Sequence, residues 1–216
     1  MEKHQFLTEM GIVPWQLKDK IHTTGQNLPE GENHDDWSTL QNEAHACTAC
    51  DLHCSRTQVV FGVGNIHADL MFIGEAPGFY EDQKGEPFVG RAGQLLNMML
   101  QAIGLERSQI YIANILKCRP PENRDPLANE VKQCTPFLKK QIDLVKPKLL
   151  IALGRISAQF LLDSKTSLTQ LRGKIHSYAN TPLIVTYHPA YLLRNPADKR
   201  KAFVDLQKII ELANSP

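Results

Sequence analysis

The chain has 216 residues, of which 42% are hydrophobic and 22% are charged, and this suits one ordinary globular domain with a hydrophobic core. No apolar run approaches the length that spans a bilayer, and the first 16 residues lack the apolar region and small-residue cleavage site of a signal peptide, so we expect a cytoplasmic protein. Residues 1–44 hold three lysines and eight acidic residues while the remainder is basic on balance, which permits contact with phosphates without requiring it.

The N-terminal part reads as a leader followed by a domain. Residues 1–20 have the pattern of one short amphipathic helix, and residues 21–36 are polar and rich in Gly, Asn and Glu, which is typical of a flexible linker. Residues 37–46 predict a helix that leads into a group of cysteines. We therefore expect a leader over residues 1–44 and a single domain over residues 45–216.

Strand and helix patterns alternate through the rest of the chain. Buried strands are predicted at residues 69–74, 110–116, 148–154 and 182–187, with a small extra strand at 173–178. Helical spacing covers residues 92–103, 127–145, 156–162 and 198–213. This alternation predicts an α/β fold in which helices cover both faces of a parallel sheet.

Polar side chains lie at or near the C-terminal ends of three of these predicted strands. Glu75 comes directly after the first strand, Asn114 lies in the second, and His188 follows the last. Ligands of open parallel sheets bind beyond the C-terminal ends of the strands. We therefore expect the three side chains to share one site, although His188 alone would suit a core histidine equally well.

The five cysteines suggest a metal centre. Cys47 and Cys50 form a CxxC pair, and Cys118 and Cys134 lie far downstream. Four thiolates can close a zinc site or hold a 4Fe–4S cluster, and their spacing does not choose between the two. We take Cys54 as a bystander. The alternative, that Cys118 and Cys134 are ordinary buried thiols, is disfavoured because Cys118 lies in a polar segment.

The loop after the first strand carries a candidate ligand-facing aromatic residue. Its sequence, GEAPG at residues 74–78, fits neither a dinucleotide-binding nor a P-loop motif. Phe88 follows Pro87 and lies close to two glycines, where a ring has little to pack against. It either offers a flat face to a ligand or packs in the core, and the acidic residues near it either serve the site or form a solvated loop.

Together these segments resemble the family 4 uracil-DNA glycosylases, the iron–sulfur branch of that superfamily. The matching strings are CTAC at 47–50, GEAPGFYEDQKGEPFVGRAGQLL at 74–96, NILKCRPPENRDP at 114–126, LG at 153–154 and HPAYLLRNP at 188–196, with the cysteine at 134. The resemblance implies a three-layer α/β/α sandwich around a parallel four-stranded sheet. It also implies a monomeric enzyme of base excision repair that acts on uracil-containing DNA, single- or double-stranded.

The resemblance assigns a role to each matching residue. Glu75 matches the catalytic acid, and His188 faces uracil O2. Phe88 matches the aromatic residue that stacks on uracil, and Asn114 matches the residue that reads its edge. Beyond these matches, we expect Ala76 and Glu81 to contact the base, with Glu81 or a nearby backbone group crowding C5. By its own composition, the segment after His188 suits a DNA wedge, in which Tyr191 and Leu192 would fill the gap in the base stack and Arg194 would contact a phosphate. Cys47, Cys50, Cys118 and Cys134 would bind a structural 4Fe–4S cluster. Residues 120–126 lack the histidine-bearing insertion of a covalently reacting branch, so turnover is expected.

Residues 7–17 resemble the N-terminal peptide of the psi subunit of the bacterial replicative clamp loader, with Leu7, Gly11, Ile12 and Trp15 in matching order. This implies a tether of residues 1–20 to the replisome. The alternative is a leader helix that packs on its own domain. Two other functions stay open: a zinc-stapled nucleic-acid-binding module without catalysis, and an iron–sulfur electron carrier.

Overall fold

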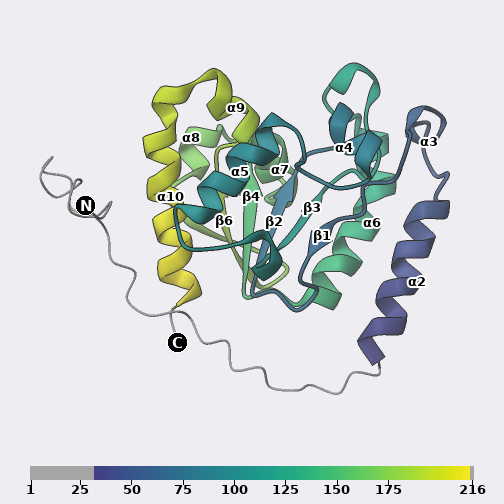
Figure 1. The fold of residues 1–216 in the computed structure, drawn as a ribbon, viewed down its shortest axis with the longest axis horizontal. Helices are drawn as coiled ribbons and strands as arrows, with labels where there is room; N and C mark the ends of the chain where they lie inside the picture. The colour runs from purple at the N-terminus through teal and green to yellow at the C-terminus, as the bar shows by residue number, and fades with distance from the viewer. Residues whose placement is uncertain (1–31, 215–216) are drawn as a thin grey trace, which may run out of the picture. The chain divides into compact units, whose positions relative to one another are not determined.

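The computed structural model describes residues 32–214 (Figure 1). The predicted helix over residues 1–20, its clamp-loader contact and most of the predicted linker lie outside this range. Among the described residues, no helix is both long and apolar enough to cross a membrane.

The sheet has six strands in the order β1-β3-β2-β4-β6-β5. The four central strands run parallel, as predicted: β3 (Tyr111–Asn114), β2 (Leu70–Gly74), β4 (Leu149–Leu153) and β6 (Thr181–Thr186). The expectation of a purely parallel, four-stranded sheet is wrong at the edges, where β1 (Val63–Gly64) and β5 (Ile175–Tyr178) are antiparallel. The sheet is therefore mixed.

The physical reason for each antiparallel edge is local, and β5 is the small extra strand predicted at residues 173–178. Strand β1 is only two residues long, which is too short for a strand pattern of its own. Strand β5 forms a hairpin with β6, because Ala179 and Asn180 between them have φ values of 48° and 67°. Two successive residues with positive φ make the type of tight turn whose twist matches antiparallel strands.

Two hydrophobic cores lie on opposite faces of the sheet. Along β2, Met71 and Ile73 belong to one core and Leu70 and Phe72 to the other, as the two-residue period of a strand dictates. The first core is closed by the helices α2 (Glu32–Ala46), α6 (Ala128–Val145), α7 (Arg155–Leu161) and α8 (Leu168–Leu171). The second is closed by α5 (Arg91–Gln101), α9 (Pro189–Arg194) and α10 (Lys199–Ala213). Helices thus cover both faces (Figure 1).

Helix α2 reaches further towards the N-terminus than predicted. It begins at Glu32, inside the segment expected to be a linker, and packs on α6. Leu40 and Ala44 are each 2% exposed, and the Trp37 ring meets the rings of Phe61 and Tyr111 edge-on at 5.4 and 5.3 Å. Burial of one apolar face holds this helix, although its sequence is largely polar. The folded body therefore includes part of the predicted leader.

Short elements fill the connections. Four short helices were not predicted from the sequence pattern, namely α3 (Leu52–Ser55), α4 (Phe79–Lys84), α8 and α9. Three 3₁₀ turns lie at Arg107–Gln109, Pro121–Asn123 and Pro196–Asp198. The strand order reverses direction at β2. After β2 the chain forms β3 on one side of it, and after β3 it forms β4 on the other side of β2. The loops that follow β2 and β4 therefore run apart and leave a crevice at the C-terminal edge of the sheet.

Candidate active site

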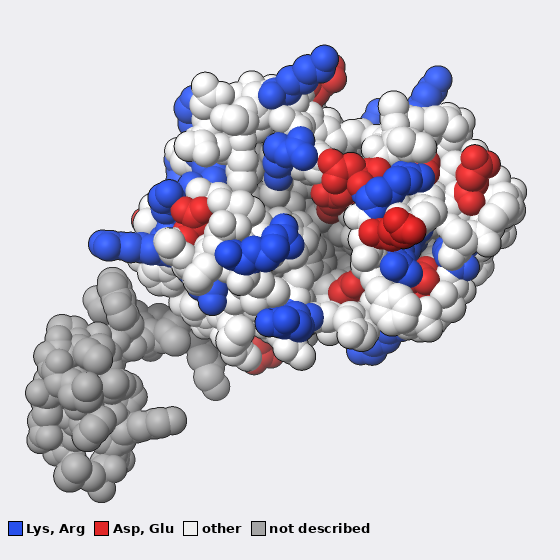
Figure 2. Space-filling model, turned by 90° about the horizontal axis from the view of Figure 1, so that it is seen from above, with Lys and Arg blue, Asp and Glu red and all other residues white. Residues whose placement is uncertain are grey.

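A cavity of about 470 Å³ opens at this edge of the sheet. Its wall contains all of the predicted substrate- and DNA-contacting residues except Leu192, namely Glu75, Ala76, Glu81, Phe88, Asn114, His188, Tyr191 and Arg194. Figure 2 looks down onto this edge and shows a hollow between two lobes, with acidic side chains gathered beside it and Lys and Arg side chains on the surrounding surface. A cavity of this size suits a small flat ligand rather than an extended chain.

Asn114 supplies a buried acceptor without a partner. It ends β3 in register with Gly74 at the end of β2, and it is 2% exposed. Its Oδ1 atom has no hydrogen-bond donor among the described residues. Leaving such an atom unpaired costs about 1–3 kcal/mol, so the site is built for a ligand that brings an N–H or O–H group.

Phe88 forms the wall beside this acceptor. Its backbone has φ of 54°, a strained value for an aromatic residue, and its ring is 6% exposed. A Cβ atom at residue 74 would meet Asn114 Oδ1 and would lie 2.8 Å from Cζ of Phe88. The ring and the amide therefore share the space that Gly74 leaves open.

The loop that carries Phe88 is held from two sides. Glu81 Oε1 accepts from the backbone N–H groups of Val89 and Gly90 at 2.8 and 3.0 Å. On the other side, Arg107 donates to the carbonyl oxygens of Pro87 and Phe88 at 2.8 and 3.2 Å. These contacts hold the strained backbone in place.

His188 lies next to the Phe88 ring in the cavity wall. The two ring centroids are 5.5 Å apart. His188 Nδ1 accepts from the backbone N–H of Ala190 at 3.1 Å, so the neutral ring carries its proton on Nε2. Burial, with the charge of Arg194 in addition, lowers the pKa of His188 to about 4. The ring is therefore a neutral N–H donor at physiological pH.

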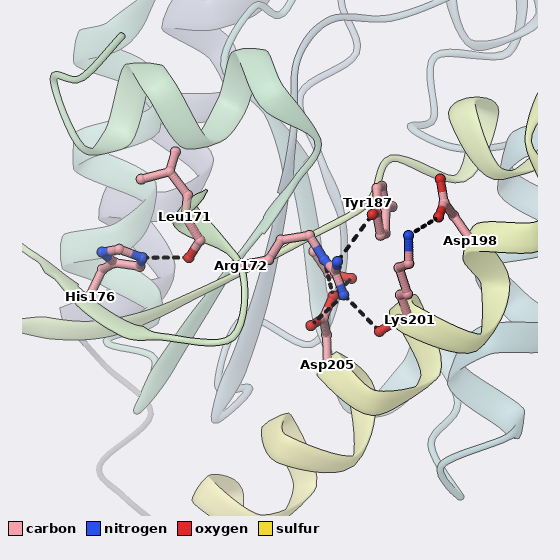
Figure 3. Close-up of polar contacts among 8 residues, drawn as sticks. Leu171, Arg172, His176, Tyr187, Asp198, Lys201 and Asp205 are labelled. Atoms are coloured by element: carbon pink, nitrogen blue, oxygen red, sulfur yellow. Dashed lines mark hydrogen bonds and ion pairs between the residues drawn. The ribbon is translucent and has the colours of Figure 1, made fainter. Parts of the chain in front are cut away.

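A polar network braces the strand that leads to His188 (Figure 3). Arg172 pairs with Asp205 through two nitrogens at 2.7 and 2.9 Å and donates to the Tyr187 hydroxyl at 3.1 Å. Its guanidinium also lies 4.1 Å from the centroid of the Tyr187 ring. Thr186, the last residue of β6, donates to Asp205 at 2.7 Å. Residues 186 and 187, directly before His188, are thus fixed by Arg172, which follows α8, and by Asp205 in α10.

Glu75 lies half-buried at the end of β2. Burial, together with the negative charge of Asp125, raises the pKa of Glu75 to about 7, while Arg155 opposes the shift. Asp125 and Arg155 form an ion pair at 3.5 Å. A carboxyl group that titrates near neutral pH is suited to orienting or deprotonating a water molecule.

A second, smaller pocket brings together Cys47, Cys50, Cys118 and Cys134, with Arg56 and Lys117 in its wall. Arg56 Nη1 lies 3.2 Å from Cys118 Sγ, and the Lys117 backbone N–H donates to Cys134 Sγ at 3.2 Å. Burial raises the pKa of the Cys134 thiol to about 11. The exposed Cys54 is absent from this wall, and its Sγ lies 3.4 Å from Nε2 of His53. Within residues 32–214, no three His, Cys, Asp or Glu side chains are grouped as ligands of a single metal ion.

Comparison with known proteins decides the family. Residues 61–208, well over half of the chain, match the model of the uracil DNA glycosylase superfamily. The chain belongs to this superfamily. The resemblance expected from the strand-end motifs is thereby confirmed, and the matched range contains every predicted cavity residue from Glu75 to Arg194.

The relatives of this superfamily member cover most of its length. It is 43% identical over 181 residues to the type-4 uracil-DNA glycosylase of Archaeoglobus fulgidus, and this alignment covers 80% of this chain and 91% of that protein. It is 44% identical to the type-4 uracil-DNA glycosylase of Sulfurisphaera tokodaii, over 84% of this chain and 87% of that protein. It is 45% identical to the type-4 uracil-DNA glycosylase of Thermotoga maritima, over 75% of this chain and 86% of that protein.

One predicted contact of this superfamily member needs correction. Leu192, expected in a DNA wedge, is 1% exposed and packs in the second core. Its neighbour Leu193 is 37% exposed. Because α9 begins at Pro189, its helical period turns residue 192 inwards and residue 193 outwards. The Tyr191 hydroxyl donates to Asp198 at 2.8 Å, and its ring stacks on Tyr187 at 5.3 Å.

Several lining residues were not predicted. Pro120, Asn123, Arg124 and Asp125 come from the segment between β3 and α6 and form one side of the cavity. The signal that could have found them was the matching string at residues 114–126, which continues well past Asn114. Charged residues in the segment that follows a strand at this edge of a parallel sheet are candidates on position alone.

Proposed function

We propose that this protein is a type-4 uracil-DNA glycosylase, which hydrolyses the N-glycosidic bond of uracil in DNA and leaves an abasic site for base excision repair. The observation that carries the proposal is the unpaired Oδ1 of Asn114, buried in one cavity with the Phe88 ring and the neutral His188. Its relatives of the same length bear the name type-4 uracil-DNA glycosylase.

Recognition of uracil follows from the Asn114 amide. Uracil presents an N–H donor at N3 and an acceptor at O4, so Oδ1 accepts from N3 while the amide nitrogen donates to O4. Cytosine presents the reverse pattern at the same two atoms. A site that pairs with uracil would leave buried polar groups unpaired with cytosine, and this kind of mismatch gives strong discrimination.

The base must leave the helix to reach this site. Flipping costs about a few kcal/mol, and stacking on an aromatic side chain returns about 1–3 kcal/mol. Phe88 supplies that ring, held by Glu81 and Arg107 before the substrate arrives. In this arrangement Glu81 acts by anchoring the loop, and its part in crowding the C5 position of thymine stays a prediction.

Bond cleavage leaves negative charge on uracil and cationic character on the sugar. His188, neutral and with its proton on Nε2, donates to O2 as negative charge builds there, which is the role of a preorganised hydrogen-bond donor. Glu75, with a pKa of about 7, orients the attacking water and offsets the positive sugar. A DNA substrate agrees with the cytoplasmic location expected from the sequence.

The four cysteines fit a 4Fe–4S cluster. Their sulfurs share one pocket, two N–H groups point at them, and each would bind a different corner of a cube, so they need not converge on one ion. Cys47, Cys50, Cys118 and Cys134 would hold the cluster. When bound, it ties the segment before β1 to the loop after β3 and so steadies residues 120–125 in the cavity wall.

The deciding experiment is incubation with a uracil-containing oligonucleotide followed by alkali. A strand break at the uracil is expected, with none at cytosine or thymine. Asn114→Ala and Glu75→Gln should each lower the single-turnover rate by about 100-fold or more. Glu122→Gln, on an exposed residue outside the cavity wall, is the matched control. No break with the brown, iron-loaded wild-type protein would refute the proposal, and a colourless zinc-loaded protein would refute the cluster.

A further inference from the structure

Two large aromatic side chains are exposed next to each other at the rim of the cavity. Phe79 is 50% exposed and Tyr80 is 63% exposed, both at the start of α4. Gly78 before them and Glu81 after them line the cavity. A single exposed apolar residue needs no explanation, but adjacent exposed rings beside a ligand site mark a binding surface.

The pair is supported from the opposite wall. The two rings meet edge-on at 5.5 Å, and the Arg119 guanidinium lies 5.1 Å from the centroid of Phe79. Arg119 also donates through Nε to Asn123 Oδ1 at 2.8 Å, and Asn123 lines the cavity. Figure 1 shows α4 beside the segment that joins β3 to α6. The rim is therefore continuous with the uracil cavity.

Tyr80 is the ring with a free face. A Cβ atom at residue 90 would lie 3.2 Å from Cδ2 of Tyr80, so the ring rests on Gly90. Gly90 belongs to the loop that Glu81 anchors behind Phe88. Arg119 covers Phe79, whereas Tyr80 is the more exposed of the two rings. Tyr80 thus packs against Gly90 on one side and is exposed to solvent on the other.

A nucleobase fits this surface. Aromatic side chains stack on bases regardless of sequence, and an arginine beside them attracts the phosphate backbone. A base within a duplex is already stacked on its neighbours and gains little here. We infer that Phe79, Tyr80 and Arg119 form a second stacking site, which takes an unpaired base beside the flipped nucleotide and makes the protein favour single-stranded or locally opened DNA. The inference rests on the proposed function, because it takes DNA as the ligand.

The test is fluorescence anisotropy with oligonucleotides that carry a tetrahydrofuran abasic analogue, so that no chemistry intervenes. Tyr80→Ala should weaken binding of the single strand by at least about fivefold and change binding of the matched duplex by less than about twofold. Tyr80→Phe, which keeps the ring, should bind like the wild type. Phe203→Ala removes a ring that is 41% exposed on α10, outside the cavity wall, and should change neither.

A second readout reports stacking itself rather than affinity. 2-Aminopurine placed next to the abasic analogue in a single strand should lose fluorescence on binding, because stacking quenches it, and should recover it with Tyr80→Ala. Equal binding by Tyr80→Ala and the wild type, or the same loss on both DNA forms, would overturn the inference. Uracil excision by the wild type is measured separately, so failure of this stacking site leaves the glycosylase proposal standing.

Discussion

Gly74 and Asn114 face each other at the C-terminal ends of β2 and β3, and the absence of a side chain at the first leaves room for the amide of the second. They are register partners in the parallel ladder, and a Cβ atom at residue 74 would collide with Asn114 Oδ1. The same atom would lie 2.8–2.9 Å from the Phe88 ring. The uracil-reading group and the stacking ring thus depend on one small residue.

Gly74→Ala should therefore displace both groups at once. We expect kcat/KM for uracil excision to fall by about 100-fold, the size of effect that a displacement of about 1 Å produces at a reacting centre. The protein should also lose about 1–3 kcal/mol of stability from overpacking. Gly173→Ala is the control: residue 173 has φ of 75° and nothing within 4 Å of a new Cβ, so stability should fall while excision stays unchanged. Normal excision by Gly74→Ala would contradict the assignment.

The sequence predicted the central sheet because β2 and β4 are buried on both faces and read as continuous apolar runs. It could not predict β1, whose pairing depends on β3 rather than on its own two residues. The Leu192 contact was misassigned for a similar reason. Neighbouring leucines at 192 and 193 look alike in sequence, and only the starting point of α9 decides which one faces the core.

The candidate site, too, could be predicted only in part from the sequence. Residues at strand ends, such as Glu75 and His188, could be placed together from the topology of a parallel sheet. The chemistry of these residues could not, because it comes from partners distant in sequence. Burial, with the charge of Asp125 in addition, raises the pKa of Glu75, and Arg107 holds the Phe88 backbone. Neither Asp125 nor Arg107 adjoins in sequence the residue that it affects.

Excision should depend on pH through Glu75. If its ionised form orients the water, the single-turnover rate rises as pH passes about 7 and then levels off. Asp125→Asn removes a negative charge that raises this pKa, so the midpoint should move to lower pH. Arg155→Gln removes a positive charge that lowers it, so the midpoint should move to higher pH. His188, with a pKa of about 4, should add no step between pH 6 and 8. A midpoint that stays in place in both variants would exclude Glu75 as the titrating group.

The Arg172–Asp205 pair should matter for stability far more than any exposed pair. Asp205 is 3% exposed and accepts from both Arg172 and Thr186. Arg172→Met leaves this carboxylate buried without its cation, which should cost about 3–5 kcal/mol of unfolding free energy in urea denaturation. Lys148→Met breaks the exposed pair with Asp69 and should cost less than about 1 kcal/mol. Equal losses in the two variants would show that the network around Tyr187 is not a brace.

Arg56 should govern how long the proposed cluster survives in air. Its guanidinium joins Cys118 Sγ to the backbone oxygens of Cys47 and His45, at 3.2, 2.9 and 3.1 Å. The four thiolates give an oxidised 4Fe–4S centre a net negative charge, which a cation beside one sulfur offsets. Arg56→Gln removes both the charge and the branched guanidinium that links the CxxC segment to Cys118.

The absorbance of Arg56→Gln near 400 nm should therefore decay several-fold faster in air than that of the wild type. Arg56→Lys keeps the charge without the branched guanidinium, so its absorbance should decay at an intermediate rate. Arg200→Gln, on the exposed face of α10, should match the wild type. Equal decay in Arg56→Gln and the wild type would mean that Arg56 serves only to fold the loop, a role that circular dichroism of the same samples would reveal.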